Sequence, residues 1–472
     1  MKKQTGQIIV GILIAGLVGA LIVTALVGWA VANITASRQT FNRELAIQIA
    51  EAGIDYYRWH LAHAPTDFQD GTGAPGPYTH NFYNKDGSVI GQFILNITAP
   101  PLGSSLVQVK STGKVSADSN ISRSILSILA KPSFAKYAVG ANANMRFGSG
   151  TEVFGPIHSN GGIRFDGLAH NVITSTLASY DDPDYDDCNN NNSFGVHTCK
   201  SPADPSPPAV VPSRPDVFEA GRQFPVPALD FSGITTDLAQ IKSDAQSNGF
   251  YRAGSGKLGY HIVLKTNGTF DLYQVTKFVN SPSNCAISWQ DGWSTWSIQN
   301  KSLIGNYAFP INGLIFLEDD VFVDGQINNV RLTIAAAVFP DNPSTRKSIT
   351  VNNDLKYTNY DGKDVLSLIA QKNINVGLVS LDNLRIDAAL VAQNGRVGRY
   401  YYSSSCGSYY IRQTITLYGM LATNQRYGFA YTNGTGYQIR NINYDGNLLY
   451  GPPPSFPLTS DQYVIVSWQE VK

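Results

Sequence analysis

The sequence is poor in charged residues and has no excess of either sign. Asp, Glu, Lys and Arg make up only 15% of its 472 residues, with 35 acidic and 35 basic side chains. A nucleic-acid-binding protein normally carries a basic patch or stripe, so we expect no nucleic-acid partner. The low charge, the 43 Gly and the 25 Tyr residues are more typical of a β-rich surface outside the cytoplasm than of a cytosolic enzyme.

Sequence motifs of the common enzyme classes are also missing. There is no G-x-S-x-G nucleophile elbow and no phosphate-binding Walker loop. Asp319 and Asp320 invite comparison with the paired carboxylates of polysaccharide-cleaving enzymes. Adjacent strand residues point to opposite faces, however, so we interpret the two as turn carboxylates. His60 and His63 lie one helical turn apart without a visible third metal ligand. We therefore predict no catalytic residues, no enzymatic activity and no cofactor.

Cysteine is scarce, with four residues in the whole chain. Cys188 and Cys199 flank a polar loop, NNNNSFGVHT, that cannot build a core of its own. Disulfides are permitted outside the cytoplasm, and the cysteine spacing does not support a zinc site. We therefore predict a disulfide between Cys188 and Cys199. Cys285 and Cys406 are then the two remaining cysteines, and this is the only argument from the sequence that they pair with each other.

A dense acidic segment precedes the first cysteine. Asp182, Asp184 and Asp186 have the alternate spacing that opens a calcium-binding loop. Asp187 stands where such a loop needs Gly, and Ser193 stands where it needs a bidentate Glu. We interpret the segment as a solvated acidic loop and predict no metal ion there, with calcium as the less favoured alternative.

One segment, by contrast, carries no charge at all. Residues 8–34 are uncharged and mostly apolar, and this run is longer than the ~20 residues that cross a bilayer as a helix. A cleaved secretory signal would have a shorter apolar core of roughly 7–15 residues. We therefore predict a retained single-pass membrane span, with the large, nearly neutral remainder of the chain outside the cytoplasm.

The helical pattern continues beyond this span without a turn signal. Apolar residues recur at steps of three or four until the first strong breaker, Pro65. They are Phe41, Leu45, Ile49, Ala52, Tyr56 and Trp59. One helix over residues 8–63 would be about 84 Å long at 1.5 Å per residue. We expect its amphipathic outer half to pack on the domain that follows.

The residues that carry a family resemblance lie in this helix. The sequence TGQIIVGILIAGLVGALIV, followed by ELAIQIAEAGIDYYRWHL, resembles the N-terminal region of PilX-type minor pilins and related type IV pilus assembly proteins. In that family a short basic leader ends in Gly, the apolar helix starts next, and an AEAG segment closes the stalk. The matching residues are Gly6 at the end of the leader, Gln7 at the mature N-terminus, and Ala50, Glu51, Ala52 and Gly53 in the AEAG segment.

The resemblance implies a leader over 1–6, a stalk helix over 7–63 and a small antiparallel sheet over 64–131. It also implies partners: other pilin or pilin-like subunits along the N-terminal helix, membrane lipid, and a prepilin peptidase that removes the leader. One position departs from the family. Major pilins usually carry Glu five residues into the mature helix, where this chain has Gly11. Because a carboxylate in lipid is costly unless it is paired, its absence fits a minor or tip subunit.

The remaining residues, 132–472, predict a β-rich head with a Pro- and Asn-rich insertion at 181–231. Short apolar stretches interrupted by Gly, Asn or Asp favour a β-helix-like unit over a sandwich, although no strict repeat emerges. Residues 232–249 predict a helix with Leu238, Ile241 and Ala245 on one face. The fold class is therefore α+β, mainly β.

Two aromatic groups in the head have no clear role from the sequence. They are Trp289, Trp293 and Trp296, and Tyr400, Tyr401, Tyr402, Tyr409 and Tyr410. Burial is the default for such residues, and exposed rings that bind sugars or proteins are the alternative.

The sequence therefore favours a structural, minor pilin-like subunit. It would be inserted in the membrane and would display its head at the cell surface or at a filament tip. The alternative is a membrane-anchored β-helix enzyme, lectin or adhesin that acts on surface glycans. The enzyme would require two convergent carboxylates in one exposed groove.

Overall fold

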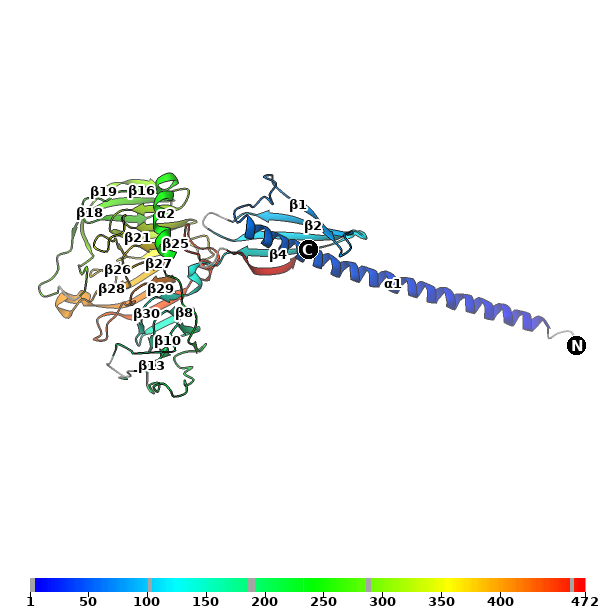
Figure 1. Ribbon diagram of the computed structural model, residues 1–472, viewed down its shortest axis with the longest axis horizontal. Helices are drawn as coiled ribbons and strands as arrows, with labels where there is room; N and C mark the ends of the chain where they lie inside the picture. Colours follow the sequence, from blue (N-terminus) through cyan, green and yellow to red (C-terminus); the bar gives the residue numbers. More distant parts are fainter. Residues whose placement is uncertain are drawn as a thin grey trace. The chain divides into compact units, whose positions relative to one another are not determined.

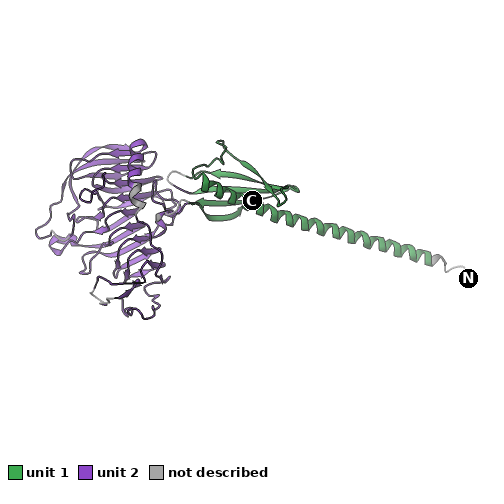
Figure 2. Cartoon of the chain, in the orientation of Figure 1, with its two compact units in different colours: residues 1–100, 106–130, 462–472 green, residues 101–105, 131–461 purple. Residues whose placement is uncertain are grey.

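The chain forms two compact units, which Figure 2 shows in different colours. The computed structural model describes residues 5–100, 104–184, 188, 192–231, 233–285, 290–458 and 462–471. Unit 1 contains residues 1–100, 106–130 and 462–472, and unit 2 contains residues 101–105 and 131–461. Unit 2 is therefore an insertion within the sequence of unit 1. The sequence prediction assigned residues 462–472 to the head, whereas they belong to unit 1.

Unit 1 begins with one uninterrupted helix, α1 (Thr5–His63), shown in blue in Figure 1. From Ile8 onward this helix is long and apolar enough to cross a membrane, with a mean hydropathy of 2.8 in its most apolar window and no burial there. Thr24 and Thr35 donate their hydroxyls to backbone carbonyls one turn earlier, at 2.9 and 2.8 Å. Each of these two hydroxyl groups therefore has its hydrogen-bond partner within the helix itself. The predicted continuous helix is confirmed.

A five-stranded antiparallel sheet follows the helix. Its strands, in spatial order, are β1 (Tyr78–Tyr83), β2 (Val89–Thr98), β3 (Val107–Val115), β4 (Asp118–Ala130) and β31 (Val464–Val471). Buried and more exposed residues alternate along β3, as expected for a sheet with one covered face. The last strand of the chain thus completes the sheet that the first four strands began. Ser127 donates its hydroxyl to the carbonyl of Ser467 at 2.9 Å, and Arg123 pairs with Glu470.

The outer part of α1 buries one face against this sheet. Its fully buried residues are Ala46, Ile49, Ala50, Ile54, Tyr57 and Leu61, and they pack with Phe93, Leu95, Val107, Val109, Ile125 and Leu129 of the strands. Of the predicted apolar stripe, only Ile49 is fully buried. Leu45, Ala52 and Tyr56 lie at the edges of the contact, and Phe41 and Trp59 are exposed.

Glycine explains why the buried face differs from the predicted one. A Cβ on Gly113 of β3 would lie 2.1 Å from the carbonyl oxygen of Ala46, and one on Gly53 would lie 2.3 Å from the Ser111 hydroxyl. The backbones of helix and strand therefore meet directly, which only glycine allows. The stripe was predicted from large side chains, whereas the closest contact is made by small ones.

Unit 2 is a stack of coils in which strands pair in parallel from one coil to the next. One face consists, in spatial order, of β16 (Phe250–Arg252), β20 (Leu314–Leu317), β22 (Arg331–Ala336), β25 (Val365–Ala370), β27 (Asn383–Ala392), β29 (Ile411–Thr423), β5 (Val139–Ala141), β8 (Ile157–Ser159), β11 (Ile173–Ser175) and β15 (Arg222–Gln223). A second face consists of β17 (Tyr260–Leu264), β21 (Val321–Ile327), β23 (Ile349–Thr350), β26 (Ile374–Val376) and β28 (Val397–Arg399). This parallel pairing differs from the antiparallel sheets of a sandwich.

Shorter parallel ladders and several antiparallel pairs complete unit 2. Beside β29 lie β30 (Gly436–Tyr444), β7 (Thr151–Phe154) and β10 (Leu168–Ala169), and β24 (Leu355–Tyr357) connects β21 with β27. A separate parallel ladder contains β6 (Met145–Phe147), β9 (Ile163–Phe165) and β14 (Val196–His197). The antiparallel pairs include β17 with β18 (Thr269–Phe278), β18 with β19 (Ile298–Ala308), and β12 (Ser179–Tyr180) with β13 (Ser193–Phe194).

The chain does not follow this stack from one end to the other. It enters at β5 beside β29 and winds outward to β11. It then passes through the insertion and α2 (Gly233–Asn248) to β16 at the opposite end, from which it winds back to β29, as the colours in Figure 1 show. Helix α2 buries Leu238, Ile241 and Ala245, which confirms its predicted inner face.

The coils differ in length, which explains why no repeat is visible in the sequence. Val139 lies opposite Ile157, and Ile157 lies opposite Ile173, so these coils advance by 18 and 16 residues. Leu332, in contrast, lies opposite Leu366, an advance of 34 residues. Stacked coils need aligned strands but not equal loops, so the extra residues lie in the turns.

Replacing Ile49 by Asp tests the packing of α1 on the sheet. The change would bury an unpaired carboxylate against the apolar face of the sheet, and we expect it to cost several kcal/mol. Limited proteolysis of the detergent-purified protein should then cleave residues 88–130 much faster than in wild type. The matched control is Gln48→Asp, because Gln48 is the exposed neighbour. Equal resistance of the Ile49→Asp variant and wild type would show that the helix does not pack there.

Candidate functional site

The candidate site is a groove of about 1380 Å³ on unit 2, which we call the basic groove. Among the residues that the structure describes, its lining contains seven basic and three acidic side chains. They are Arg146, Lys200, Arg346, Lys372, Arg396, Arg426 and Arg440, with Asp166, Asp184 and Asp291. These residues come from different coils, so the groove crosses several coils.

Strand register places the basic residues of the groove on successive coils. Ile349 pairs with Ile374, and Ile374 pairs with Val397. Arg346, Lys372 and Arg396 precede these three aligned residues by three, two and one positions. The next coil continues the series, because Gly398 bridges to Gly428, which brings Arg426 opposite Arg396.

One further coil extends the series, because Arg426 and Arg146 of β6 approach the same carboxylate, that of Asp184, at 3.1 and 3.8 Å. Arg164 of β9 lies in register with Arg146 but is fully buried. Because neighbouring strands lie about 4.8 Å apart, basic side chains follow one another along the groove at about that spacing.

Several of these cations already have carboxylate partners. Lys372 contacts Asp291 at 2.8 Å, and Arg346 contacts Asp341 at 2.7 Å. The hydrogen bond from Lys372 lowers the pKa of Asp291, and that from Arg346 lowers the pKa of Asp341. The Asp291 side chain is 89% exposed, so this pair is a solvated surface contact of small net energy.

Arg396 differs from these residues. Its guanidinium lies over the ring of Tyr400, 5.1 Å from the ring centre. It donates hydrogen bonds to the carbonyl of Arg399 at 3.1 Å and to the hydroxyl of Tyr431 at 3.4 Å. Within the part of the chain that the structure describes, it forms no ion pair with a carboxylate. The Arg396 charge is thus held in place without being neutralised.

The two aromatic groups meet in space beside the groove, and Tyr400 lines the groove itself. Trp293 donates its indole N–H to the carbonyl of Tyr401 at 3.0 Å, and the ring of Trp296 stacks on that of Tyr400. Tyr400 and Tyr402 are buried, as expected for core residues. Trp289 lies outside the described residues.

A disulfide lies next to this aromatic cluster. Cys285 and Cys406 are both fully buried and are bonded to each other, with their Cα atoms 4.7 Å apart. The bridge connects segments separated by 121 residues. The structure therefore pairs Cys285 with Cys406, the two cysteines that remained after the first predicted disulfide.

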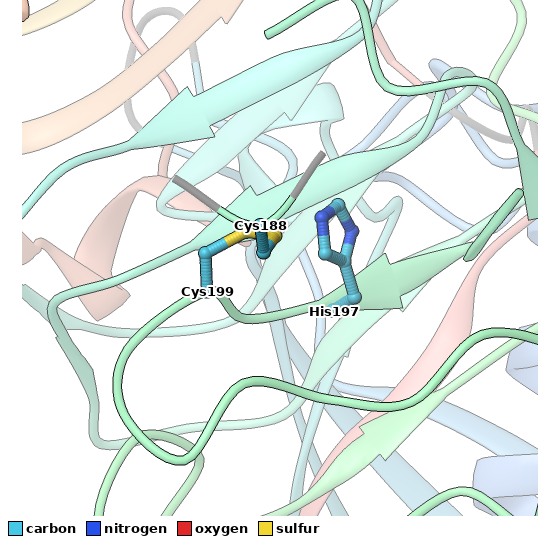
Figure 3. A group of neighbouring side chains, drawn as sticks. All are labelled: Cys188, His197 and Cys199. Carbon is cyan, nitrogen blue, oxygen red and sulfur yellow. A yellow bond between two sulfur atoms is a disulfide. The ribbon is translucent and has the colours of Figure 1, made fainter. Parts of the chain in front are cut away.

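The second cysteine pair lies at the groove, which Cys199 lines, and Figure 3 shows this pair with His197. Cys188 and Cys199 form a disulfide, with Cα atoms 5.4 Å apart. His197 is buried beside them, and its possible metal-ligating atom lies within 4.8 Å of the two sulfurs. Metal binding requires thiolates, so in the disulfide form these three residues do not constitute a metal site.

The acidic segment is not a solvated loop throughout, which corrects the sequence interpretation. Asp182 is only 3% exposed and lies 3.2 Å from Nε2 of His197. Burial acts to raise the pKa of Asp182, but the neighbouring His197 and a hydrogen bond from the backbone N–H of Asp184 hold it below its ordinary value. Asp184 pairs with Arg426. Asp186 lies outside the described residues.

The described carboxylates of the groove are all held by basic side chains. Asp166 accepts a hydrogen bond from Arg164 at 2.8 Å, Asp184 pairs with Arg426, and Asp291 pairs with Lys372. A glycan-cleaving enzyme needs an acid and a base that face the same bond. Among the described residues of the groove, no such free pair exists.

The remaining predicted sites lie in α1. Gly6 and Gln7 fall within its first turns, and residues 1–4 of the expected leader lie outside the described residues. In the AEAG segment, Ala50 and Gly53 face the sheet, Ala52 lies at the edge and Glu51 is exposed. His60 and His63 do not converge: His60 contacts Asp67 at 3.0 Å, and His63 contacts the carbonyl of Trp59 at 2.8 Å.

Comparison with known proteins gives little. No family model matches the sequence, and no curated protein matches it. Among solved structures, the chain is similar to the competence-associated pilin ComZ from Thermus thermophilus, with 12% identity and a TM-score of 0.30 over 91% of this chain and 98% of that one. This similarity is too low to define a shared fold, so the functional reasoning rests on the residues described above.

Removal of the longer disulfide loop should lower the stability of the chain more than removal of the shorter one. In the chain-entropy model a cross-link that closes about 100 residues is worth about 4.7 kcal/mol, and one that closes about 15 residues is worth about 3 kcal/mol. The double variant Cys285→Ala/Cys406→Ala should therefore unfold at a lower urea concentration than the matched variant Cys188→Ala/Cys199→Ala. Urea unfolding of the full chain, followed by tryptophan fluorescence, measures both. The reverse order would contradict the dominant role of the longer bridge.

Asp320 should make the stability of unit 2 depend on pH. Burial raises its pKa from 3.8 to about 6, although its carboxylate accepts a hydrogen bond from the N–H of Ser348 at 2.8 Å. The folded state therefore holds this proton more tightly than the unfolded state does, and the contribution of Asp320 falls as the pH rises from about 4 to about 6.

The variant Asp320→Asn keeps the acceptor and removes the buried charge. It should match wild type near pH 4 and exceed it by up to about 3 kcal/mol at pH 7.5, at 1.36 kcal/mol per pKa unit. Urea unfolding at the two pH values measures the difference. The control is Asp361→Asn, because Asp361 pairs with Lys363 at the surface. A gain that is equal at both pH values would exclude titration of Asp320 as its cause.

Proposed function

We propose that the chain is a minor pilin-like subunit of a type IV pilus or a related secretion filament. The single observation that supports this most strongly is the construction of α1. Its first part is apolar and unburied, and its last part packs on an antiparallel sheet within the same unit. A helix that leaves its apolar half uncovered requires lipid or another apolar helix as a partner.

The uncovered half of α1 is suited to both partners. A Cβ added at Gly11, Gly16, Gly19 or Gly28 would meet nothing within 4 Å. Small residues on an apolar helix allow neighbouring helices to approach closely in lipid. In this proposal the span holds the subunit in the membrane before assembly and packs against the helices of other pilin subunits after it.

The insertion of unit 2 supports the display of a head. Both chain connections of unit 2 lead to unit 1: β4 ends before it and β31 begins after it. The main segment of unit 2, residues 131–461, is therefore connected to unit 1 at both of its ends, and its position in the sequence leaves the stalk helix continuous. We propose that unit 1 supplies the filament module and that unit 2 lies outside the cytoplasm as the displayed head.

The enzyme alternative receives less support. The described carboxylates of the basic groove are paired with basic side chains, as shown above, so they do not provide the acid and base that glycan cleavage needs. A binding role for the groove is compatible with a pilin-like subunit and is considered below.

Mass spectrometry of the mature N-terminus tests the processing that the proposal includes. If the leader is removed after Gly6, the protein from envelope fractions begins at Gln7. A Gly6→Leu variant should keep its leader, while Thr5→Ala should be processed like wild type. Recovery of wild-type protein that begins at Met1 or Lys2 would rule out leader cleavage.

Incorporation into a filament needs a separate measurement. The full chain should sediment with sheared surface filaments, and cross-links from α1 should reach the N-terminal helix of another pilin subunit. Its presence only in the membrane fraction, without such cross-links, would contradict the filament role and leave a plain membrane-anchored protein.

A further inference from the structure

We propose that the basic groove of unit 2 binds an extended acidic polysaccharide, of the kind built from uronic acids. This inference goes beyond the proposed filament role and does not depend on leader cleavage. Its starting point is the arrangement of basic side chains on successive coils, one behind another at the same edge of the stack.

The arrangement is linear and repeats at the coil spacing. Register places Lys372, Arg396 and Arg426 on three consecutive coils, and Arg146 follows on the next through its shared contact with Asp184. Consecutive coils lie about 4.8 Å apart. A compact anion would reach only one or two of these cations, whereas an extended polymer with a charge on each unit contacts the whole series.

The charge balance of the groove favours a polyanion. Among its described lining residues, seven basic side chains face three acidic ones, although the whole chain is neutral. Arg396 forms no ion pair within the described residues, and Asp291, the partner of Lys372, is largely exposed. A polymer carboxylate can therefore contact Arg396 directly and can replace Asp291 at little cost, because exposed ion pairs are weak.

Arg396 is also oriented for this contact. Its guanidinium is held over Tyr400 and is hydrogen-bonded to the Tyr431 hydroxyl. A planar guanidinium matches the two oxygens of a carboxylate, and holding it in place beforehand reduces the entropy lost on binding. Lys372, by comparison, supplies a point charge on a flexible stem.

Neutral polar groups lie between the cations. Gln425 and Gln438 are exposed at the groove, and Asn394 lies beside them on a neighbouring coil. Amide side chains offer both donors and acceptors, which suit the hydroxyl groups of a sugar. Gly395 and Gly434 also line the groove, and they leave room for a chain to approach the backbone.

A single-stranded nucleic acid fits this groove less well than a uronate polymer. Proteins that bind such strands offer free aromatic faces on which bases stack. Here Tyr400, Tyr427 and Phe429 are buried, and the ring of Tyr431 packs edge-on against Tyr401. The described aromatic residues of the groove therefore offer little stacking surface.

Binding of defined polymers to the detergent-solubilised full chain tests the proposal. The probe is polygalacturonate, and its fully methyl-esterified form is the matched ligand because it has the same sugar backbone without the charge. Dextran and single-stranded and double-stranded DNA are the other probes. We expect saturable, salt-sensitive binding of polygalacturonate and at least tenfold weaker binding of the methyl ester, dextran and both DNAs.

Two groove variants and two controls locate the site. Arg396→Gln should weaken polygalacturonate binding about tenfold, the size expected for one charge-assisted hydrogen bond, and Lys372→Gln should weaken it several-fold. Lys257→Gln and Lys277→Gln remove exposed charges outside the groove and should bind like wild type. Because Lys372 makes only a surface pair, its variant keeps the test valid if Arg396→Gln proves unstable.

Four results would overturn the proposal. They are no binding of polygalacturonate, equal binding of its methyl ester, equal or tighter binding of DNA, and equal losses in the groove and control variants. None of these results depends on whether the N-terminus is processed or the chain enters a filament, so the failure of this inference and that of the filament role can be told apart.

Discussion

The direct contact between the backbones of α1 and β3 is the constraint on which the rest of unit 1 depends. Gly113 leaves no room for a side chain against the Ala46 carbonyl, and Gly53 leaves none against Ser111. This contact fixes the rotation of the helix, and the rotation decides which residues are buried. The sheet covers α1 where these small residues lie, and the apolar first part of the helix is unburied. The contact therefore separates the part of α1 that packs on the sheet from the part that is long and apolar enough to cross a membrane.

The sheet that receives the helix is completed from the far end of the sequence. Strand β31 pairs with β4 over seven residue pairs, and Tyr463 just before it donates its hydroxyl to the Pro65 carbonyl at 3.2 Å. The loop that this pairing closes contains residues 131–461 of unit 2. Large sequence separation between paired strands increases the entropy cost of closing them. A stable, self-contained unit 2 reduces this cost, because it holds the ends of the insertion in a fixed relation.

Several features could be predicted because they depend on local patterns. The continuous helix follows from the absence of a breaker before Pro65, and the inner face of α2 follows from the spacing of Leu238, Ile241 and Ala245. The rotation of α1 was predicted in part: Leu45, Ile49 and Tyr56 do contact the sheet, whereas Phe41 and Trp59 are exposed. Hydrophobic periodicity gives weight to such large side chains and none to glycine.

The features that were missed depend on contacts between distant segments. The return of β31 and the meeting of Trp293 with Tyr401 join residues more than one hundred positions apart. The basic groove was missed because its cations are spread over the chain and the coils have unequal lengths. A signal was present: Asn or Gln shortly precedes Arg146, Lys372, Arg396 and Arg426 in the segments NMR, QK, NGR and NQR. Without knowledge of the coil register, these short segments could not be aligned.

Hydrogen–deuterium exchange of a Gly113→Ala variant, as the full chain in detergent, tests the central claim most directly. The new methyl group would overlap the Ala46 carbonyl, so the account predicts that residues 46–61 and β3 lose most of their protection, while residues 8–34 and unit 2 keep theirs. Gly446→Ala, where an added Cβ meets no atom within 4 Å, should exchange like wild type. Unchanged protection of residues 46–61 in Gly113→Ala would show that this backbone contact does not hold α1 on the sheet.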